Sequence, residues 1–285
     1  MYDVIIVGAG PAGISASLYL KRSKLNVLVI SKGYGALEKA HKIENYYGLK
    51  EPISGKELFD IGVEQAEKLG IEVVSDEVMS IMLEDCFTVT TVNREYQAKK
   101  VILATGTSRK APNIKGIQEY EGKGISYCAV CDAFFYRNKD VAVLGSGNYA
   151  IHEAMQLKPV VNSVTILTNG EPIVENRDGV EFEINEKPIR EFRGGTVIEE
   201  VEFENQDTKK VNGIFVAMGT ASTSDLARKI GAVVQNGNIQ VDENMKTTVE
   251  DLYACGDCTG GILQINKAVY EGAKAAFHII SNSKR

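Results

Sequence analysis

Three features that the sequence lacks exclude several classes of protein before any motif is considered. The 285 residues include only five cysteines, too few for a secreted domain stapled by disulfides. No apolar run approaches the roughly 20 residues that a membrane helix needs. The chain also opens on the strand-like run Tyr2 to Val7, without a basic segment and a cleavage site. We therefore expect a cytoplasmic protein that spans no membrane.

Positive charge is also in short supply, because the net charge is -6. Residues 113 to 213 hold 11 Lys and Arg against 17 Asp and Glu, whereas the rest of the chain is balanced. This argues against general binding to nucleic acid or anionic membranes. Residues 21 to 56, called here the basic segment, are an exception, with only three acidic residues. Its cations are Lys21, Arg22, Lys24, Lys32, Lys39, Lys42, Lys50 and Lys56.

The first glycine-rich motif lies between two expected strands. The strand Tyr2 to Val7 leads into Gly8-Ala9-Gly10-Pro11-Ala12-Gly13, then a helical pattern from Ile14 to Lys21 and a strand from Asn26 to Ile30. Glycines at these positions permit a tight turn and let a pyrophosphate approach the helix N-terminus. The pattern predicts a β-α-β dinucleotide-binding unit.

A second unit of the same kind follows in the middle of the chain. The strand Asp140 to Leu144 leads into Gly145-Ser146-Gly147-Asn148-Tyr149-Ala150, a helix from Ile151 to Leu157 and a strand from Ser163 to Thr168. We predict an α/β fold with two Rossmann-like, three-layer ββα domains, the second inserted in the first. The repeat indicates descent from two dinucleotide sites and leaves present occupancy open.

The domain boundaries follow from the strands that flank the middle segment. Lys100 to Ala104 resembles the strand that leads into the middle domain, and Gly213 to Gly219 resembles the return. We expect residues 1-112 and 214-285 to form one discontinuous domain. Residues 113-213 are expected to form a second domain inserted in it.

Between the two glycine motifs lies the sequence Cys128-Ala129-Val130-Cys131-Asp132. Two thiols at this spacing can close into a disulfide that exchanges readily, and the adjacent carboxyl can carry the proton that exchange requires. The alternative is half of a structural zinc site, which needs two further ligands. Only Cys255 and Cys258 offer a second pair. We interpret these two as packing residues, with an auxiliary redox pair as the alternative, and expect no metal.

Taken in order, these motifs resemble those of the low-molecular-weight thioredoxin reductases along nearly the whole chain. Ile43 to Gly48 and Phe134 to Arg137 resemble that family as well. The resemblance implies an FAD-binding domain at residues 1-112 and 214-285 and a degenerate NAD(P)H-like domain with a redox disulfide at residues 113-213. It also implies thioredoxin as partner and a homodimer, with Asp257 on the ribityl chain and Asn45 and Gln264 near the isoalloxazine. It implies a cofactor site made of Gly8, Gly10, Pro11, Ala12, Gly13, Asn45, Ala104, Thr105, Gly106, Gly256, Asp257, Gln264 and Ile265.

The same resemblance assigns catalytic roles. Cys131 is expected to face the flavin and receive electrons, Cys128 to attack the thioredoxin disulfide, and Asp132 to move the proton. One departure lies at Ser31, where many dinucleotide folds place an acidic residue that binds a ribose.

The electron donor is expected to differ from that of the ordinary family members. NADPH-dependent relatives place a His-Arg-Arg cluster after the strand that follows the second glycine motif, whereas this chain has Leu167 to Pro172 there, with Glu171. Such a site lacks the cations that grip a 2'-phosphate. Ser146 and Tyr149 also alter the second glycine turn.

These departures resemble the ferredoxin-dependent flavin thioredoxin reductases of the clostridial type. An acidic ferredoxin would need a cationic docking face, and the basic segment could supply it. We therefore expect an enzyme that takes electrons from ferredoxin. An NADPH- or NADH-dependent thioredoxin reductase and a flavin-bearing thiol redox sensor are the alternatives.

Overall fold

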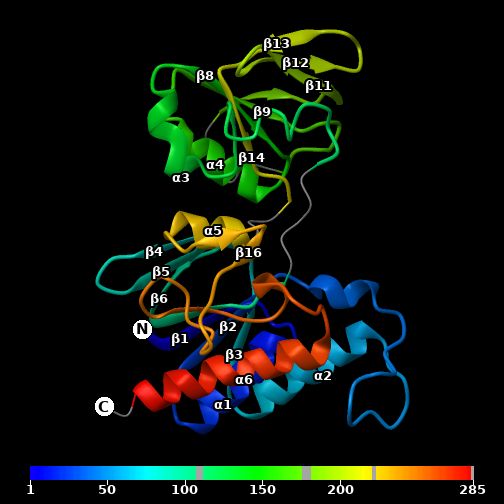
Figure 1. Cartoon of the computed structure of the whole chain (residues 1–285), viewed down its shortest axis with the longest axis vertical. Coiled ribbons are helices and arrows are strands. Elements are labelled where there is room, and N and C mark those ends of the chain that lie inside the picture. Colours follow the sequence, from blue (N-terminus) through cyan, green and yellow to red (C-terminus); the bar gives the residue numbers. More distant parts are fainter. Residues whose placement is uncertain (107–111, 175–180, 220–222, 284–285) are drawn as a thin grey trace. The chain divides into compact units, whose positions relative to one another are not determined.

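The chain divides into two compact units, each an α/β assembly. The computed structural model describes residues 1–106, 112–174, 181–219 and 223–283. Met1–Ser108 and Ser222–Arg285 form the first unit, and Arg109–Ala221 form the second (Figure 1). The predicted α/β fold with two Rossmann-like halves is confirmed.

A parallel sheet forms the centre of the first unit. Its strand order is β3-β2-β1-β6-β17, and all of these strands pair in parallel. Strands of Val, Ile and Leu suit a sheet that is buried on both faces. Their bounds are β1 Tyr2–Val7, β2 Val27–Ser31, β3 Glu72–Ser75, β6 Glu95–Leu103 and β17 Leu252–Ala254.

The first half of β6 belongs to a second layer. It pairs antiparallel with β5 (Phe87–Thr91), which pairs in turn with β4 (Val78–Leu83). Helices α1 (Pro11–Arg22), α2 (Gly55–Lys68) and α6 (Ile265–Asn282) form the third layer (Figure 1), and α1 contacts both α2 and α6.

Helix α1 can lie unusually close to α6 because of Gly272. A Cβ atom at that position would lie 2.0 Å from the Ala12 carbonyl oxygen. The tight crossing brings the start of α1 against the part of the chain that follows β17. The remaining short elements of this unit are η1 Gly35–Lys39, α5 Thr223–Lys229, β15 Val234–Gln235, β16 Asn238–Ile239 and η3 Asp257–Thr259.

The second unit repeats this plan with a smaller sheet. Its parallel order is β10-β9-β8-β14-β7, next to an antiparallel sheet β11-β12-β13. Helix α4 packs on β8 and β9, and the short helix α3 packs on α4. The bounds are β7 Ile125–Ser126, α3 Ala129–Asp132, η2 Ala133–Tyr136, β8 Asp140–Leu144, α4 Asn148–Leu157, β9 Ser163–Leu167, β10 Glu183–Asn185, β11 Ile189–Gly194, β12 Ile198–Phe203, β13 Thr208–Lys210 and β14 Gly213–Val216.

The chain passes from the second unit back to the first at a later residue than the sequence predicted. The boundary at residue 214 would cut β14 out of the second unit, but β14 lies between β8 and β7 in that sheet. Its four residues are fully buried there, so the strand is needed to complete the core. The assignment of the first unit to FAD and of the second to a degenerate nucleotide fold stays a prediction.

The helices that follow the two glycine turns begin earlier than the hydrophobic periodicity indicated. Helix α1 begins at Pro11 and α4 at Asn148, three residues before the expected starts at Ile14 and Ile151. Proline suits the first helical position because its missing N–H has no partner there in any case. In the described part of the chain, no helix has the length and apolarity that crossing a membrane requires.

Candidate functional site

The first glycine turn leaves open space at the N-terminus of α1. Gly8 has φ 112°, and a Cβ there would lie 2.4 Å from the Ala104 carbonyl oxygen, so only glycine fits. A Cβ at Gly13 would lie 1.9 Å from the Gly8 oxygen. By contrast, a Cβ at Gly10 would meet no atom within 4 Å. The turn is thus packed against the protein on one side and open on the other.

This open side has the properties of an anion site. Gly10 caps α1 without a side chain, Pro11 and Ala12 begin the helix, and its first turn holds no acidic residue. Backbone N–H groups at a helix N-terminus favour a phosphate. The turn therefore fits the pyrophosphate of the expected FAD.

The other residues predicted to bind FAD converge on the same edge of the first unit. Ala104, Thr105 and Gly106 follow β6, and the Ala104 N–H donates to the Val7 oxygen at 2.8 Å. Gly256 follows β17, and a Cβ there would lie 3.0 Å from the Ala12 Cβ. This is the carboxyl edge of the parallel strands, where ligands bind in such folds.

Asn45 and Gln264 also meet, although neither lies in a strand. Asn45 Nδ2 donates to Gln264 Oε1 at 3.3 Å. Gln264 is the N-cap of α6 and Ile265 is its first residue. The role of each of these residues in binding FAD stays a prediction.

Sequence reasoning missed a Lys–Glu pair that holds the loop bearing Asp257. Lys267 Nζ donates to the Gly256 and Gly260 oxygens at 2.7 and 2.5 Å and lies 3.0 Å from Glu271 Oε2. The same Glu271 oxygen accepts from the Gly256 N–H at 2.9 Å. The spacing of four residues on one helix could have revealed the pair.

The Asp257 carboxyl itself is partly buried. This burial raises its pKa, and the charge of Lys267 opposes the increase. The group therefore lies in a partly desolvated position, held by a loop that Lys267 and Glu271 fasten to α6.

The thiols that flank Asp257 are buried and free. Cys255 and Cys258 are 0% and 2% exposed. Burial raises the pKa of Cys255 well above its ordinary value and that of Cys258 to about 12. Because the thiolate is the reactive form, these values favour the packing interpretation over an auxiliary redox pair. Within the described ranges, no three His, Cys, Asp or Glu side chains form a group that could hold a metal ion.

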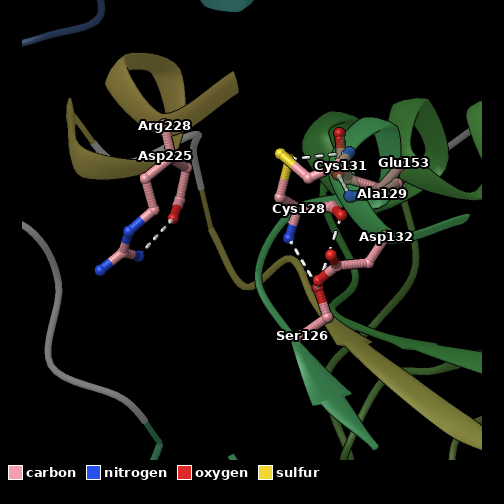
Figure 2. The surroundings of a disulfide bond; sticks show 8 residues. All are labelled: Ser126, Cys128, Ala129, Cys131, Asp132, Glu153, Asp225 and Arg228. Atoms are coloured by element: carbon pink, nitrogen blue, oxygen red, sulfur yellow. Dashed lines mark hydrogen bonds and ion pairs between the residues drawn. A yellow bond between two sulfur atoms is a disulfide. The ribbon is translucent and has the colours of Figure 1, made fainter. Parts of the chain in front are cut away.

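The second unit carries the redox pair. Cys128 and Cys131 form a disulfide with their Cα atoms 5.3 Å apart, at the start of α3 (Figure 2). Cys128 Sγ accepts a hydrogen bond from the Cys131 N–H at 3.1 Å. Cys128 is buried, with 6% exposed, whereas Cys131 is exposed. The two residues of the pair therefore differ in solvent exposure.

Asp132 lies beside this pair with a partner that sequence reasoning missed. Ser126 Oγ donates to Asp132 Oδ2 at 2.6 Å and accepts from the Cys128 N–H at 3.1 Å (Figure 2). On α4, the 1% exposed Glu153 accepts from the Ala129 N–H at 3.0 Å. Glu153 could have been noticed as a charged residue on the apolar face of the helix. The structure thus brings all three predicted catalytic residues together.

The second glycine turn is tied to the segment that follows β9. The Val174 N–H donates to the Ser146 oxygen at 2.9 Å, and Asn169 Oδ1 accepts from the Ile189 N–H at 2.7 Å. Tyr149 is 1% exposed, so its ring fills interior space at the beginning of α4. Residues 167–174 contain no Lys or Arg, and Glu171 is their only charged side chain.

Known proteins of similar sequence and structure share both units. A family model described as pyridine nucleotide-disulphide oxidoreductase matches residues 2–272. A thioredoxin reductase from Aquifex aeolicus (strain VF5) is 36% identical over 299 residues, covering 98% of this chain and 92% of the relative.

Two solved structures extend the comparison. The atypical thioredoxin reductase TRi from Desulfovibrio vulgaris Hildenborough gives a TM-score of 0.94 at 37% identity, covering 100% of this chain and 98% of that chain. A ferredoxin-flavin thioredoxin reductase from Clostridium acetobutylicum gives 0.75 at 29% identity, covering 99% and 98%.

Members of the thioredoxin reductase family are FAD-binding flavoproteins, and the β1–α1 turn of this chain fits that cofactor. The match to the family model spans both glycine turns and the redox pair between them. This chain therefore belongs to the pyridine nucleotide-disulphide oxidoreductases and, within them, to the thioredoxin reductase family.

Proposed function

We propose that this flavoenzyme reduces the disulfide of thioredoxin through FAD and the Cys128–Cys131 pair, with electrons from reduced ferredoxin. The observation that carries the choice of donor is the hydrogen bond between Val174 and Ser146. In dinucleotide folds, the cofactor passes between the glycine turn and the end of the next strand. Here the glycine turn is bonded to Val174, in the segment that follows this strand.

The chemistry of that segment also disfavours NADPH. A 2'-phosphate is usually gripped by Arg or Lys through charge-assisted hydrogen bonds. Residues 167–174 offer Glu171 instead, and Asn169 is already engaged with the backbone of Ile189. A phosphate placed there would meet a carboxylate and no cation from this segment.

The similarity to the Clostridium acetobutylicum protein, whose name includes ferredoxin, also supports ferredoxin as the electron donor. Bound FAD supplies the chemistry that links a one-electron donor to a two-electron disulfide. In the first unit, the open turn at Gly10 would hold the pyrophosphate and Asp257 would accept from the ribityl hydroxyls. Asn45 and Gln264 would hold the loop and the start of α6 together around the ring system.

The residues of the second unit would carry out the exchange with thioredoxin. Asp132 would donate a proton to the leaving thiolate and accept one when a thiol is activated. The family resemblance assigns the attack on thioredoxin to Cys128, but Cys131 is the more exposed residue of the pair. An attacking thiolate must be accessible, so attack by Cys128 would require a movement that exposes it.

NADH dependence is the second candidate, and one feature favours it. Gly145 and Gly147 are retained, and a Cβ at Gly145 would lie 2.2 Å from the Ala217 oxygen, so the turn keeps its tight form. NADH has no 2'-phosphate and needs no cationic clamp.

An anaerobic titration tests the donor. Purified protein is mixed with NADPH, NADH or separately reduced ferredoxin, and bleaching of the visible flavin band is followed. We expect bleaching by ferredoxin alone. Rapid bleaching by NADPH or NADH would overturn the ferredoxin proposal, and a failure to turn over repeatedly with thioredoxin would favour a redox sensor.

A further inference from the structure

We propose that Ser126 is a positioning residue that orients the Asp132 carboxylate beside the redox pair. The inference rests on the role proposed above for Asp132 as the acid and base of disulfide exchange. Its starting point is a single hydroxyl that contacts both Asp132 and the backbone of Cys128 (Figure 2).

The bonding capacity of a hydroxyl determines which way Ser126 points. A serine hydroxyl has one proton to donate and two lone pairs. The Cys128 N–H donates to Ser126 Oγ at 3.1 Å and so occupies one lone pair. Two oxygens compete for the proton, Asp132 Oδ2 at 2.6 Å and the Cys128 carbonyl at 3.4 Å. The shorter bond to the carboxylate is charge-assisted and stronger, so the hydroxyl points to Asp132.

The backbone that carries this hydroxyl is held by a buried, paired strand. Ser126 ends β7, is 7% exposed, and pairs with Phe215 of β14. Asp132 is held from its own backbone as well, because its N–H donates to the Cys128 oxygen at 3.2 Å. One carboxylate oxygen is therefore fixed by Ser126, which leaves Oδ1 for proton exchange.

The step that depends on this orientation can be written without any partner protein. Oδ1 of the Asp132 carboxylate accepts the proton of a dithiothreitol thiol, whose sulfur attacks the sulfur of Cys131. The Cys128–Cys131 bond breaks, Cys128 leaves with the electron pair, and Asp132 passes its proton to the Cys128 thiolate. The second dithiothreitol sulfur then attacks the mixed disulfide and releases the Cys131 thiolate, so the protein pair is reduced by two electrons and the dithiol is oxidised to its cyclic disulfide.

The test measures this reduction rate in the flavin-loaded protein under anaerobic conditions, with alkylation of the new thiols to stop the reaction. We expect Ser126→Ala to slow reduction about tenfold, the effect of losing one hydrogen bond to a charged group. Asp132→Asn is expected to slow it about a hundredfold, as for loss of a general acid. The decisive variant is the double one, because Ser126→Ala should cost nothing further when Asp132→Asn is already present.

Two further variants separate positioning from folding. Ser126→Thr keeps the hydroxyl and should retain most of the rate, whereas Ser126→Val, which is isosteric with the threonine variant but has no hydroxyl, should behave like Ser126→Ala. Ser163→Ala is the matched control, since Ser163 Oγ donates to Asp140 Oδ1 at 2.5 Å in the same unit without contacting the pair. Its rate should equal that of the wild type.

An equal loss from Ser126→Ala with and without Asp132→Asn would overturn the inference, because Ser126 would then act only on the Cys128 backbone. Full activity of Ser126→Val would do the same. Neither thioredoxin nor an electron-donor protein takes part in the assay. A wild-type protein that fails to reduce thioredoxin would therefore count against the proposed function and still leave the comparison of variants readable.

Discussion

Asn45 donates a hydrogen bond to Gln264 across 219 positions of the chain, joining the loop after η1 to the N-cap of α6. Gln264 caps α6 directly after the loop that bears Asp257. The bond therefore links two segments that are expected to contact the same cofactor.

Removing this bond should weaken FAD binding. We expect Asn45→Ala to raise the dissociation constant of FAD about fivefold, the usual effect of one neutral hydrogen bond. Titration of the apoprotein with FAD, followed by quenching of flavin fluorescence, measures it. Gln264→Ala should have a similar effect, and the double variant should be no worse than either single one. Additive losses would show that the two side chains act separately.

The Lys267–Glu271 pair that holds the Asp257 loop should contribute strongly to the free energy of unfolding. Lys267→Met leaves the 12% exposed Glu271 carboxylate without its cation, and breaking such a pair typically costs about 3 kcal/mol. Urea unfolding with FAD bound measures the loss. The double variant with Glu271→Gln should recover part of it, because no uncompensated charge remains. A single variant as stable as the wild type would contradict the argument.

Mixed-disulfide trapping should identify the sulfur that meets thioredoxin. Because Cys131 is exposed and Cys128 is buried, we expect reduced Cys128→Ser to trap a thioredoxin variant that lacks its resolving cysteine and whose remaining cysteine is activated as a mixed disulfide with thionitrobenzoate. Attack by the enzyme thiolate releases thionitrobenzoate and forms the protein mixed disulfide. Cys131→Ser should trap this thioredoxin variant much more slowly. Mass spectrometry of the non-reduced complex checks which bond forms. Faster trapping through Cys128 would support the role that the family resemblance assigns to it and a movement that exposes it.

The buried Cys258 thiol should make stability fall at alkaline pH. Burial raises its pKa from 9.0 to about 12 in the folded protein. A raised folded-state pKa contributes stability that is complete below pH 9 and is lost as the pH rises toward 12. Between pH 8 and 10, the wild type should therefore lose about 1 kcal/mol more unfolding free energy than Cys258→Ala. Parallel urea titrations at the two pH values test this, and equal losses would exclude it.

Charge reversal on the basic segment should slow reduction by ferredoxin. Lys42 and Lys56 are paired with Glu44 and Glu38, so the exposed Lys39 and Lys50 are the better targets. We expect Lys39→Glu with Lys50→Glu to lower the second-order rate of flavin reduction about tenfold at low salt and less at high salt.

The control for this charge effect is a matched pair of reversals on the other unit. Lys123→Glu with Lys210→Glu changes the net charge equally at exposed positions. Unaltered ferredoxin kinetics in the first pair, or an equal loss in both pairs, would place the docking surface elsewhere.

Local patterns were enough to predict much of this protein. The first glycine turn depends largely on residues close in sequence, because Gly8 has a positive φ and a Cβ at Gly13 would strike the Gly8 oxygen. The spacing of Cys128 and Cys131 is likewise local, and it allowed a disulfide to be expected from the sequence alone.

Prediction went wrong where pairing partners decide the outcome. The sequence of β14 suits either unit, and its place is determined by its pairing with both β8 and β7. Nothing near Tyr149 in the sequence indicated that its ring would be buried.

What the sequence by itself determined is the order of motifs, and with it the fold, the family and the identity of the redox pair. Tertiary structure alone decided the contacts of Ser126 with Asp132, of Asn45 with Gln264 and of Val174 with Ser146. The physical reason is that these bonds join separate elements. Their distances depend on how strands and helices pack, which no local pattern of residues encodes.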